Sequence, residues 1–327
     1  MLLRMLSISQ KEQVTMNVPN VPIINLETAH NDQKQIKLLD LACRDHGFFL
    51  LKNHGMQQEI DDMWKHSQWF FSQDRKEKLK LLRSEEIPLG FYDRELTKQK
   101  RDLKEVFDFM ETRMDHDINQ WPEEISFKNS MEDFFFKSSD VANQTLDLIL
   151  SCLGLTENNY VFGDSRTSNA RLNFYPINDP LDNIEKDTVN ELGDMALHHH
   201  TDPGILTLLL QDMTGGLQAK SKEFGWIDIL PEENSIVVNL GDAMQVWTND
   251  NYVAAIHRVL KRTSESRYST PFFFNPKSES IIEPIPEIAE SNPVYKSFTW
   301  KQYIRGRIDD NYQDLGQDDI QISNFKI

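Results

Sequence analysis

The chain has 327 residues, of which 39% are hydrophobic and 10% aromatic, so it is long enough to bury a sizeable core. Its formal net charge of −17 argues against nucleic acid or an anionic membrane as a partner, and no apolar run approaches the roughly 18 residues that a membrane helix needs. The two cysteines, Cys43 and Cys152, exclude a disulfide framework and fit a reducing, cytoplasmic location.

The first half of the chain predicts helices with short strands between them. Residues 1–18 are polar and aperiodic, and we expect a disordered tail there. Apolar residues at helical spacing predict three helices, over 31–44, 60–71 and 130–153. Short apolar or aromatic runs predict strands over 21–26, 48–51 and 104–109.

From about Ser168 the sequence changes to short apolar runs separated by turns, which is typical of a β-sandwich or jelly roll. Eight strands are predicted, over 169–175, 205–211, 216–220, 226–229, 235–240, 244–248, 255–262 and 268–274. Residues 289–307 are expected to be helical only in part, because Pro293 interrupts the pattern. We therefore predict one compact unit in which helices surround a β core.

His200 and Asp202 stand directly before a β-rich apolar run, and on a strand two such residues would project to the same face. His257, arriving from a later strand, would complete a set of two imidazoles and one carboxylate. That set is associated with non-haem Fe(II) oxygenases and leaves coordination positions open. His198 and His199 do not fit this spacing, and we expect rim or solvated side chains there. The alternative is a buried, hydrogen-bonded triad without a metal.

Two further pairs repeat the two-residue spacing, Asn173 with Tyr175 and Arg267 with Ser269. On strands of a closed sheet, all four side chains could point inward. The planar guanidinium fork and the Ser hydroxyl suit a carboxylate ligand. Core packing is the alternative for Asn173 and Tyr175, and a surface charge is the alternative for Arg267. Five aromatic residues are expected in the core or lining a substrate pocket: Phe91, Tyr92, Phe107, Phe273 and Phe274.

With these motifs in place, residues 21–276 resemble the isopenicillin N synthase-like branch of the Fe(II)/2-oxoglutarate-dependent oxygenases. The matching segments include Asn173-Phe174-Tyr175-Pro176, His200-x-Asp202, His257-Arg258-Val259 and Arg267-x-Ser269, in the family's order. The arginine lies ten residues beyond the second histidine, as it does in the family. One departure is Thr248-Asn249-Asp250, where the family usually has Thr-Asn-Gly.

The resemblance implies a mainly β fold with flanking helices and a distorted double-stranded β-helix (jelly roll) as its core. Residues 161–280 would form that core, and residues 19–160 would pack on it. Residues 281–327 would add a C-terminal helical segment and an acidic tail. The family's metal ligands fall on His200, Asp202 and His257, which would hold Fe(II).

The resemblance also implies 2-oxoglutarate as co-substrate and O₂ as oxidant. The far carboxylate of 2-oxoglutarate would meet Arg267 and Ser269, with Tyr175 and Asn173 as helpers. The enzyme, expected to be a monomer, would oxidise an unactivated C–H bond of a small specialised metabolite or amino-acid-derived substrate. Hydroxylation, desaturation and oxidative ring closure are all open, with release of succinate and CO₂.

Three other functions are weighed against this one. A related oxidase of the isopenicillin N synthase type would use no 2-oxoglutarate, and its Arg-x-Ser pair could hold the substrate's own carboxylate. A non-catalytic metal or small-ligand binding module would need neither reaction. A zinc hydrolase is disfavoured, because no general base accompanies the triad at motif spacing.

Overall fold

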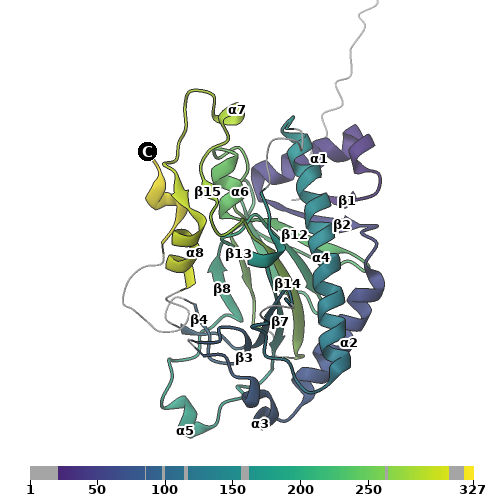
Figure 1. Cartoon of the computed structure of the whole chain (residues 1–327), viewed down its shortest axis with the longest axis vertical. Helices are drawn as coiled ribbons and strands as arrows, with labels where there is room; N and C mark the ends of the chain where they lie inside the picture. Colours follow the sequence, from purple (N-terminus) through teal and green to yellow (C-terminus); the bar gives the residue numbers. More distant parts are fainter. Residues whose placement is uncertain are drawn as a thin grey trace, which may run out of the picture.

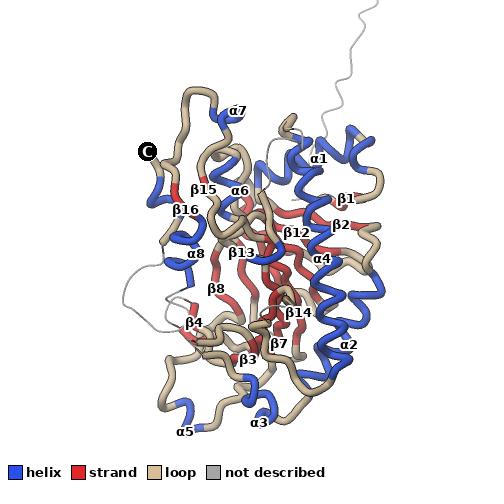
Figure 2. Tube along the Cα trace, viewed as in Figure 1, coloured by secondary structure: helices blue, strands red, loops and turns tan. Residues whose placement is uncertain are grey.

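Two β-sheets lie at the centre of the computed structural model, with helices on the outside (Figures 1 and 2). The structure describes residues 21–84, 86–97, 100–113, 117–155, 162–261, 264–308 and 320–327. The predicted disordered tail and the acidic stretch 309–319 lie outside these residues. No helix among the described residues is long and apolar enough to cross a membrane.

The larger sheet has eight strands in the order β1-β2-β12-β9-β14-β7-β6-β3. All neighbouring pairs are antiparallel except β1 with β2. In the order of the sheet, the strands are β1 Ile23–Asn25, β2 Phe48–Lys52, β12 Ile236–Leu240, β9 Leu206–Gln211, β14 Arg267–Phe274, β7 Asn169–Tyr175, β6 Glu105–Met110 and β3 Gly90–Tyr92.

The smaller sheet is antiparallel and has the order β11-β10-β13-β8. Its strands are β11 Gly225–Asp228, β10 Leu217–Ser221, β13 His257–Val259 and β8 Leu197–His200. Two short hairpins complete the strands, β4 Leu96–Thr97 with β5 Lys100–Arg101, and β15 Ile281–Ile282 with β16 Phe298–Thr299.

The long helices cover the larger sheet. Helix α4 (Ile125–Cys152) runs against β9 and β14 and packs beside α1 (Gln33–Asp45) and α2 (Gln57–Ser72) (Figure 1). Its buried stripe includes Phe127, Met131, Phe134 and Val141, which recur at helical spacing. The shorter helices are α3 Arg75–Lys78, α5 Asn183–Lys186, α6 Asp242–Trp247, α7 Pro286–Ala289 and α8 Trp300–Ile308, with 3-10 turns at Ala29–Asn31, Leu79–Leu81, Ser165–Thr167 and Ile322–Phe325.

A small apolar cluster packs between the two sheets. Phe48, Leu50 and Leu209 come from the larger sheet, and Leu217 and Val259 come from the smaller one. This cluster holds the sheets face to face as a sandwich. The rest of the space between the sheets is a polar cavity, so the fold itself places a binding site there.

The expected fold class, mainly β with flanking helices and a jelly-roll core, is confirmed. One predicted strand is wrong, because residues 244–248 lie in and just after helix α6. A five-residue apolar run fits a buried strand or one helical turn equally well. The predicted helix over 130–153 begins earlier, at Ile125, and the strand expected over 255–262 is confined to His257–Val259.

Replacing Phe107 should show how much of the stability comes from the aromatic core under α4. Its ring is fully buried and lies 4.8 Å from Phe70 and 5.4 Å from Phe127, centroid to centroid. Phe107→Ala should lower the free energy of unfolding by about 3–5 kcal/mol, measured by denaturant titration. The matched control is Phe136→Ala, since that ring is 65% exposed and its loss should cost less than about 0.5 kcal/mol. Similar losses for the two variants would contradict this assignment of the core.

Candidate metal centre

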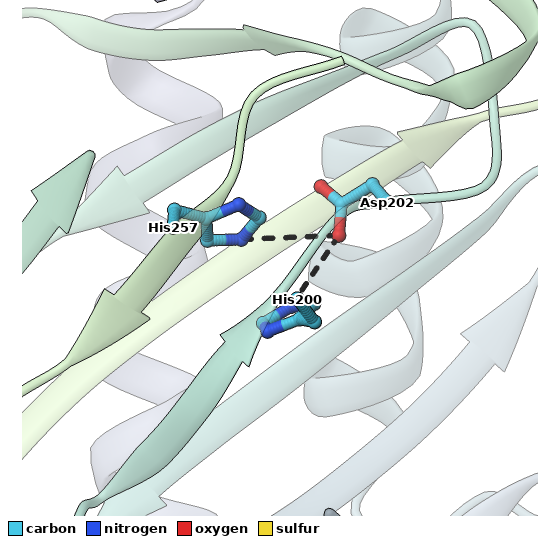
Figure 3. A group of neighbouring side chains, drawn as sticks. All are labelled: His200, Asp202 and His257. Carbon is cyan, nitrogen blue, oxygen red and sulfur yellow. Dashed lines mark ion pairs between the residues drawn. The ribbon is translucent and has the colours of Figure 1, made fainter. Parts of the chain in front are cut away.

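Three side chains from separate places in the chain converge between the sheets. His200 is the last residue of β8, and His257 is the first residue of β13, directly opposite it in register. Asp202 Oδ1 lies 3.6 Å from His200 Nε2 and 3.9 Å from His257 Nε2 (Figure 3). One donor atom from each residue lies within 4.8 Å of the other two, which is close enough to share one ion.

Asp202 reaches this position by a different route from the one predicted. Strand β8 ends at His200, so Asp202 lies in the loop beyond it, and strand alternation does not orient its side chain. Hydrogen bonds do so instead: Oδ2 accepts from Thr207 Oγ1 at 2.6 Å and from Asn239 Nδ2 at 2.7 Å. Both donors belong to the larger sheet, on β9 and β12. They occupy one carboxylate oxygen and leave Oδ1 facing the histidines.

The two imidazoles are held in the tautomer that binds metal through Nε2. His200 Nδ1 lies 2.8 Å from the carbonyl oxygen of His198, and His257 Nδ1 lies 2.9 Å from that of Ala255. A carbonyl oxygen only accepts, so each Nδ1 must carry the proton. Each Nε2 then presents its lone pair to the centre of the triad, as in metal-binding histidines whose other nitrogen is tied to a carbonyl.

Burial sets the charges of the site. It lowers the pKa of His200 to about 3, with the adjacent His257 acting in the same direction. Burial alone would raise the pKa of Asp202, but His257, His200 and the bonds from Thr207 and Asn239 outweigh it, and the pKa is lowered. A neutral His200 beside an anionic Asp202 is the protonation state that metal binding requires.

The donor set therefore fits a divalent metal. Two imidazole nitrogens and one carboxylate oxygen occupy one side of an ion and leave coordination positions open on the other. Among first-row metals this set is typical of non-haem Fe(II). The open side faces a cavity of about 550 Å³, which is a usual size for a small-molecule site.

The other four predicted site residues line the same cavity. On neighbouring strands β14 and β7, Arg267 lies opposite Tyr175, and Ser269 lies opposite Asn173. The guanidinium of Arg267 stands over the Tyr175 ring at 5.0 Å, and Asn173 Nδ2 donates to Ser269 Oγ at 3.4 Å. The expected two-residue alternation therefore does place both pairs on one face.

Arg267 is almost fully buried and only partly satisfied. Its Nε donates to the carbonyl oxygen of Gly215 at 3.0 Å, and Nη2 lies 3.5 Å from Gln211 Oε1. Nη1 has no hydrogen-bond partner among the described residues. A buried guanidinium nitrogen without a partner is costly unless a ligand fills the place, and a carboxylate is the ligand that matches it best.

The neighbouring histidines do not join the triad. His198 lies beside Asp194 and Asp102, at 3.2 Å and 3.6 Å, and His199 is exposed at the edge of the cavity near Trp226. Of the five aromatic residues, Phe91, Phe107 and Phe274 lie in the buried core and Tyr92 is half-buried, whereas Phe273 lines the cavity.

Several residues that position the site were not predicted. Thr207 and Asn239 carry a signal in hindsight, since each is a polar residue inside an otherwise apolar strand. The C-terminal helix α8 contributes Arg307, whose Nη2 donates to the carbonyl oxygen of Thr201 at 2.7 Å. Tyr303 of the same helix donates to Asp242, whose backbone N–H donates to the Asp202 carbonyl at 2.8 Å. No local pattern reveals that α8 returns to this loop.

Comparisons with known proteins agree with this geometry. Residues 166–276 match the 2OG-Fe(II) oxygenase superfamily, and residues 21–124 match the N-terminal region described as that of a non-haem dioxygenase in morphine synthesis. The chain is similar to 1-aminocyclopropane-1-carboxylate oxidase 4 of Solanum lycopersicum, with 33% identity over 88% of this chain and 89% of that protein. Feruloyl CoA ortho-hydroxylase 2 of Arabidopsis thaliana is 29% identical over 92% and 82% of the two chains.

Solved structures show the same likeness. A full-length protein of Neurospora crassa, in complex with alpha-KG, superposes with a TM-score of 0.75 and 29% identity, over 88% of this chain and 96% of that one. JOX2, in complex with 2OG, Fe and JA, gives a TM-score of 0.73 and 26% identity, over 87% and 84% of the two chains.

The hydrogen bonds to Asp202 should control metal affinity. Asn239→Ala or Thr207→Val removes one donor to Oδ2, and we expect Fe(II) to bind roughly 10- to 100-fold more weakly in each variant. Anaerobic Fe(II) titration would measure this effect. The control is His199→Ala, since His199 lies outside the triad and its loss should leave the affinity near that of the wild type. Unchanged affinity in both Asn239→Ala and Thr207→Val would show that the loop is positioned without them.

Proposed function

Because the chain belongs to the 2OG-Fe(II) oxygenase superfamily, we propose that it oxidises an unactivated C–H bond of a small molecule, with Fe(II) and 2-oxoglutarate. The observation that carries this proposal is one cavity that joins two features. One is the triad of His200, Asp202 and His257, and the other is Arg267 with its unpartnered Nη1. The product would be a hydroxylated, desaturated or ring-closed substrate, released with succinate and CO₂.

The triad would hold Fe(II) through the two Nε2 atoms and Asp202 Oδ1. When bound, iron supplies the activation of O₂, and 2-oxoglutarate supplies two electrons as it is decarboxylated to succinate. The residues of the chain position the reactants. Thr207 and Asn239 fix the carboxylate, and the backbone carbonyls of His198 and Ala255 fix the two rings.

Arg267 and Ser269 would bind the far carboxylate of 2-oxoglutarate. Arg267 offers Nη1, and its guanidinium is held in place by the Gly215 carbonyl and the Tyr175 ring. Asn173 Nδ2 donates to Ser269 Oγ, so the hydroxyl hydrogen stays available to donate to a carboxylate. Asn173 and Tyr175 would thus act through their neighbours.

The solved relatives support this assignment, since one contains alpha-KG and another contains 2OG and Fe. A second candidate is an iron oxidase that uses no 2-oxoglutarate, with Arg267 holding the carboxylate of the substrate. Its support is that relatives 30–33% identical to the chain carry the name oxidase. The two functions differ in whether oxygen consumption releases succinate.

The test of the activity is succinate release from 2-oxoglutarate under O₂. Wild-type protein with Fe(II) should release succinate, and a pool of small metabolites that contains the substrate should stimulate the release. Asp202→Ala removes the only anionic ligand and should abolish turnover, whereas His199→Ala should keep most of it. Loss of activity in His199→Ala with retention in His200→Ala would contradict the ligand assignment.

Arg267→Leu should separate the two candidate functions. Truncating one partner of a buried, hydrogen-bonded charge pair costs roughly 2–5 kcal/mol, which is a roughly 30-fold to several-thousand-fold loss in 2-oxoglutarate affinity. The measurement is the apparent dissociation constant, followed anaerobically through the iron charge-transfer band. A keto acid without the distal carboxylate serves as the control and should lose far less. Normal 2-oxoglutarate binding together with lost binding of the primary substrate would favour the oxidase.

A further inference from the structure

Strands β7 and β14 present their inward side chains as two parallel rows along the cavity. Arg267 lies opposite Tyr175 at one end, and Phe273 lies opposite Asn169 at the other. The six residues from Arg267 to Phe273 span about 20 Å. Phe273 therefore lies far from the place proposed for the distal carboxylate of 2-oxoglutarate.

The Phe273 end of the rows lies beside the metal centre. On its other side, Phe273 is paired in register with Thr207, the residue that donates to Asp202 Oδ2. A molecule that lies against Phe273 would therefore be next to the carboxylate ligand. This is where the C–H bond to be oxidised has to be, if the proposed function is correct.

The cations near this end are already neutralised. Besides Arg267, the cavity is lined by Lys104, Arg171 and Arg307. Lys104 Nζ lies 2.9 Å from Glu95 and 3.2 Å from Asp102. Arg171 donates to both oxygens of Asp108, at 2.6 and 2.9 Å, and to Glu95 at 2.9 Å. Arg307 faces Asp242 and donates to the Thr201 carbonyl.

Lys104 and Arg171 belong to a balanced network of three cations and three carboxylates. Its members are Arg83, Lys104 and Arg171 with Glu95, Asp102 and Asp108. Burial alone would raise the pKa of Glu95, but Arg171, Lys104 and Arg83 lower it well below its usual range. Burial alone would lower the pKa of Lys104, but Glu95 and Asp102 raise it. Both groups stay ionised, so an incoming charge of either sign would find no free counter-charge.

Two groups at this end remain available for a ligand. The Phe273 ring is half-buried and has no ring partner among the described aromatic residues. The Asn169 amide lines the cavity and makes no side-chain hydrogen bond within the described chain. A ring face and an amide on adjacent strands suit a flat molecule that bears its own hydrogen-bonding groups.

From this arrangement we infer that the primary substrate is an uncharged planar ring compound with amide-type donors and acceptors, bound by Phe273 and Asn169. Carboxylic acids of the same size are excluded by the balanced network. The inference rests on the proposed function, because it assigns Arg267 to 2-oxoglutarate and so leaves no unpaired cation for the substrate.

The test uses two matched pairs of probes, nicotinamide with nicotinate and uracil with orotate. Full-length protein is loaded anaerobically with Fe(II) and 2-oxoglutarate, and each probe is titrated while the charge-transfer band is followed. In each pair the neutral probe should bind at least about tenfold more tightly than the acid, because the acid brings an unpaired charge into the cavity. Asn169→Ala and Phe273→Leu should each weaken nicotinamide roughly three- to tenfold. Phe136→Leu, at an exposed position on α4, should change neither value.

Glu95→Gln provides a second test of the charge argument. It removes one negative charge from the cavity wall, so the preference for nicotinamide over nicotinate should narrow or reverse. An unchanged preference in Glu95→Gln with an intact band would overturn the inference, as would tighter binding of the acids or no response to either neutral probe. Failure of the band to form with Fe(II) and 2-oxoglutarate would instead contradict the proposed function and this inference with it.

Discussion

The cost of burying charge is the constraint on which the cavity depends. Asp202 can stay ionised between the sheets because Thr207 and Asn239 saturate its Oδ2. Glu95 stays ionised because Lys104 and Arg171 face it. Each group that keeps an open valence, such as Asp202 Oδ1, therefore indicates what the cavity is built to receive.

Side-chain alternation along strands explains which site residues could be predicted and which could not. It places Tyr175 and Asn173 on one face of β7, and Arg267 and Ser269 on the adjacent face of β14, because both segments are regular strands. The same rule fails for Asp202, because β8 ends two residues earlier. The expected proximity of Asp202 to His200 nevertheless holds, because it follows from two long-range hydrogen bonds that local spacing cannot reveal.

The fold class was predictable because turn-bounded apolar runs dominate the second half of the chain. The error at residues 244–248 has a tertiary cause: Asp242, at the start of α6, is held by Tyr303 of α8, far away in the sequence. Arg307 escaped prediction for the same reason, since α8 reaches the Thr201 carbonyl only in the folded chain. Local patterns predict elements well, but they do not say which loop a distant helix will contact.

The division of the triad between the sheets has a mechanical consequence. His200 and His257 belong to the smaller sheet, whereas Asp202 is tied to the larger sheet through β9 and β12. An ion bound by all three would be a non-covalent rivet across the sandwich, added to the thin apolar seam that joins the sheets elsewhere. Its binding energy would be felt by the whole fold, because a ligand that prefers the folded state raises the melting temperature by mass action. Iron supply would then govern how long the folded protein survives as well as how fast it works.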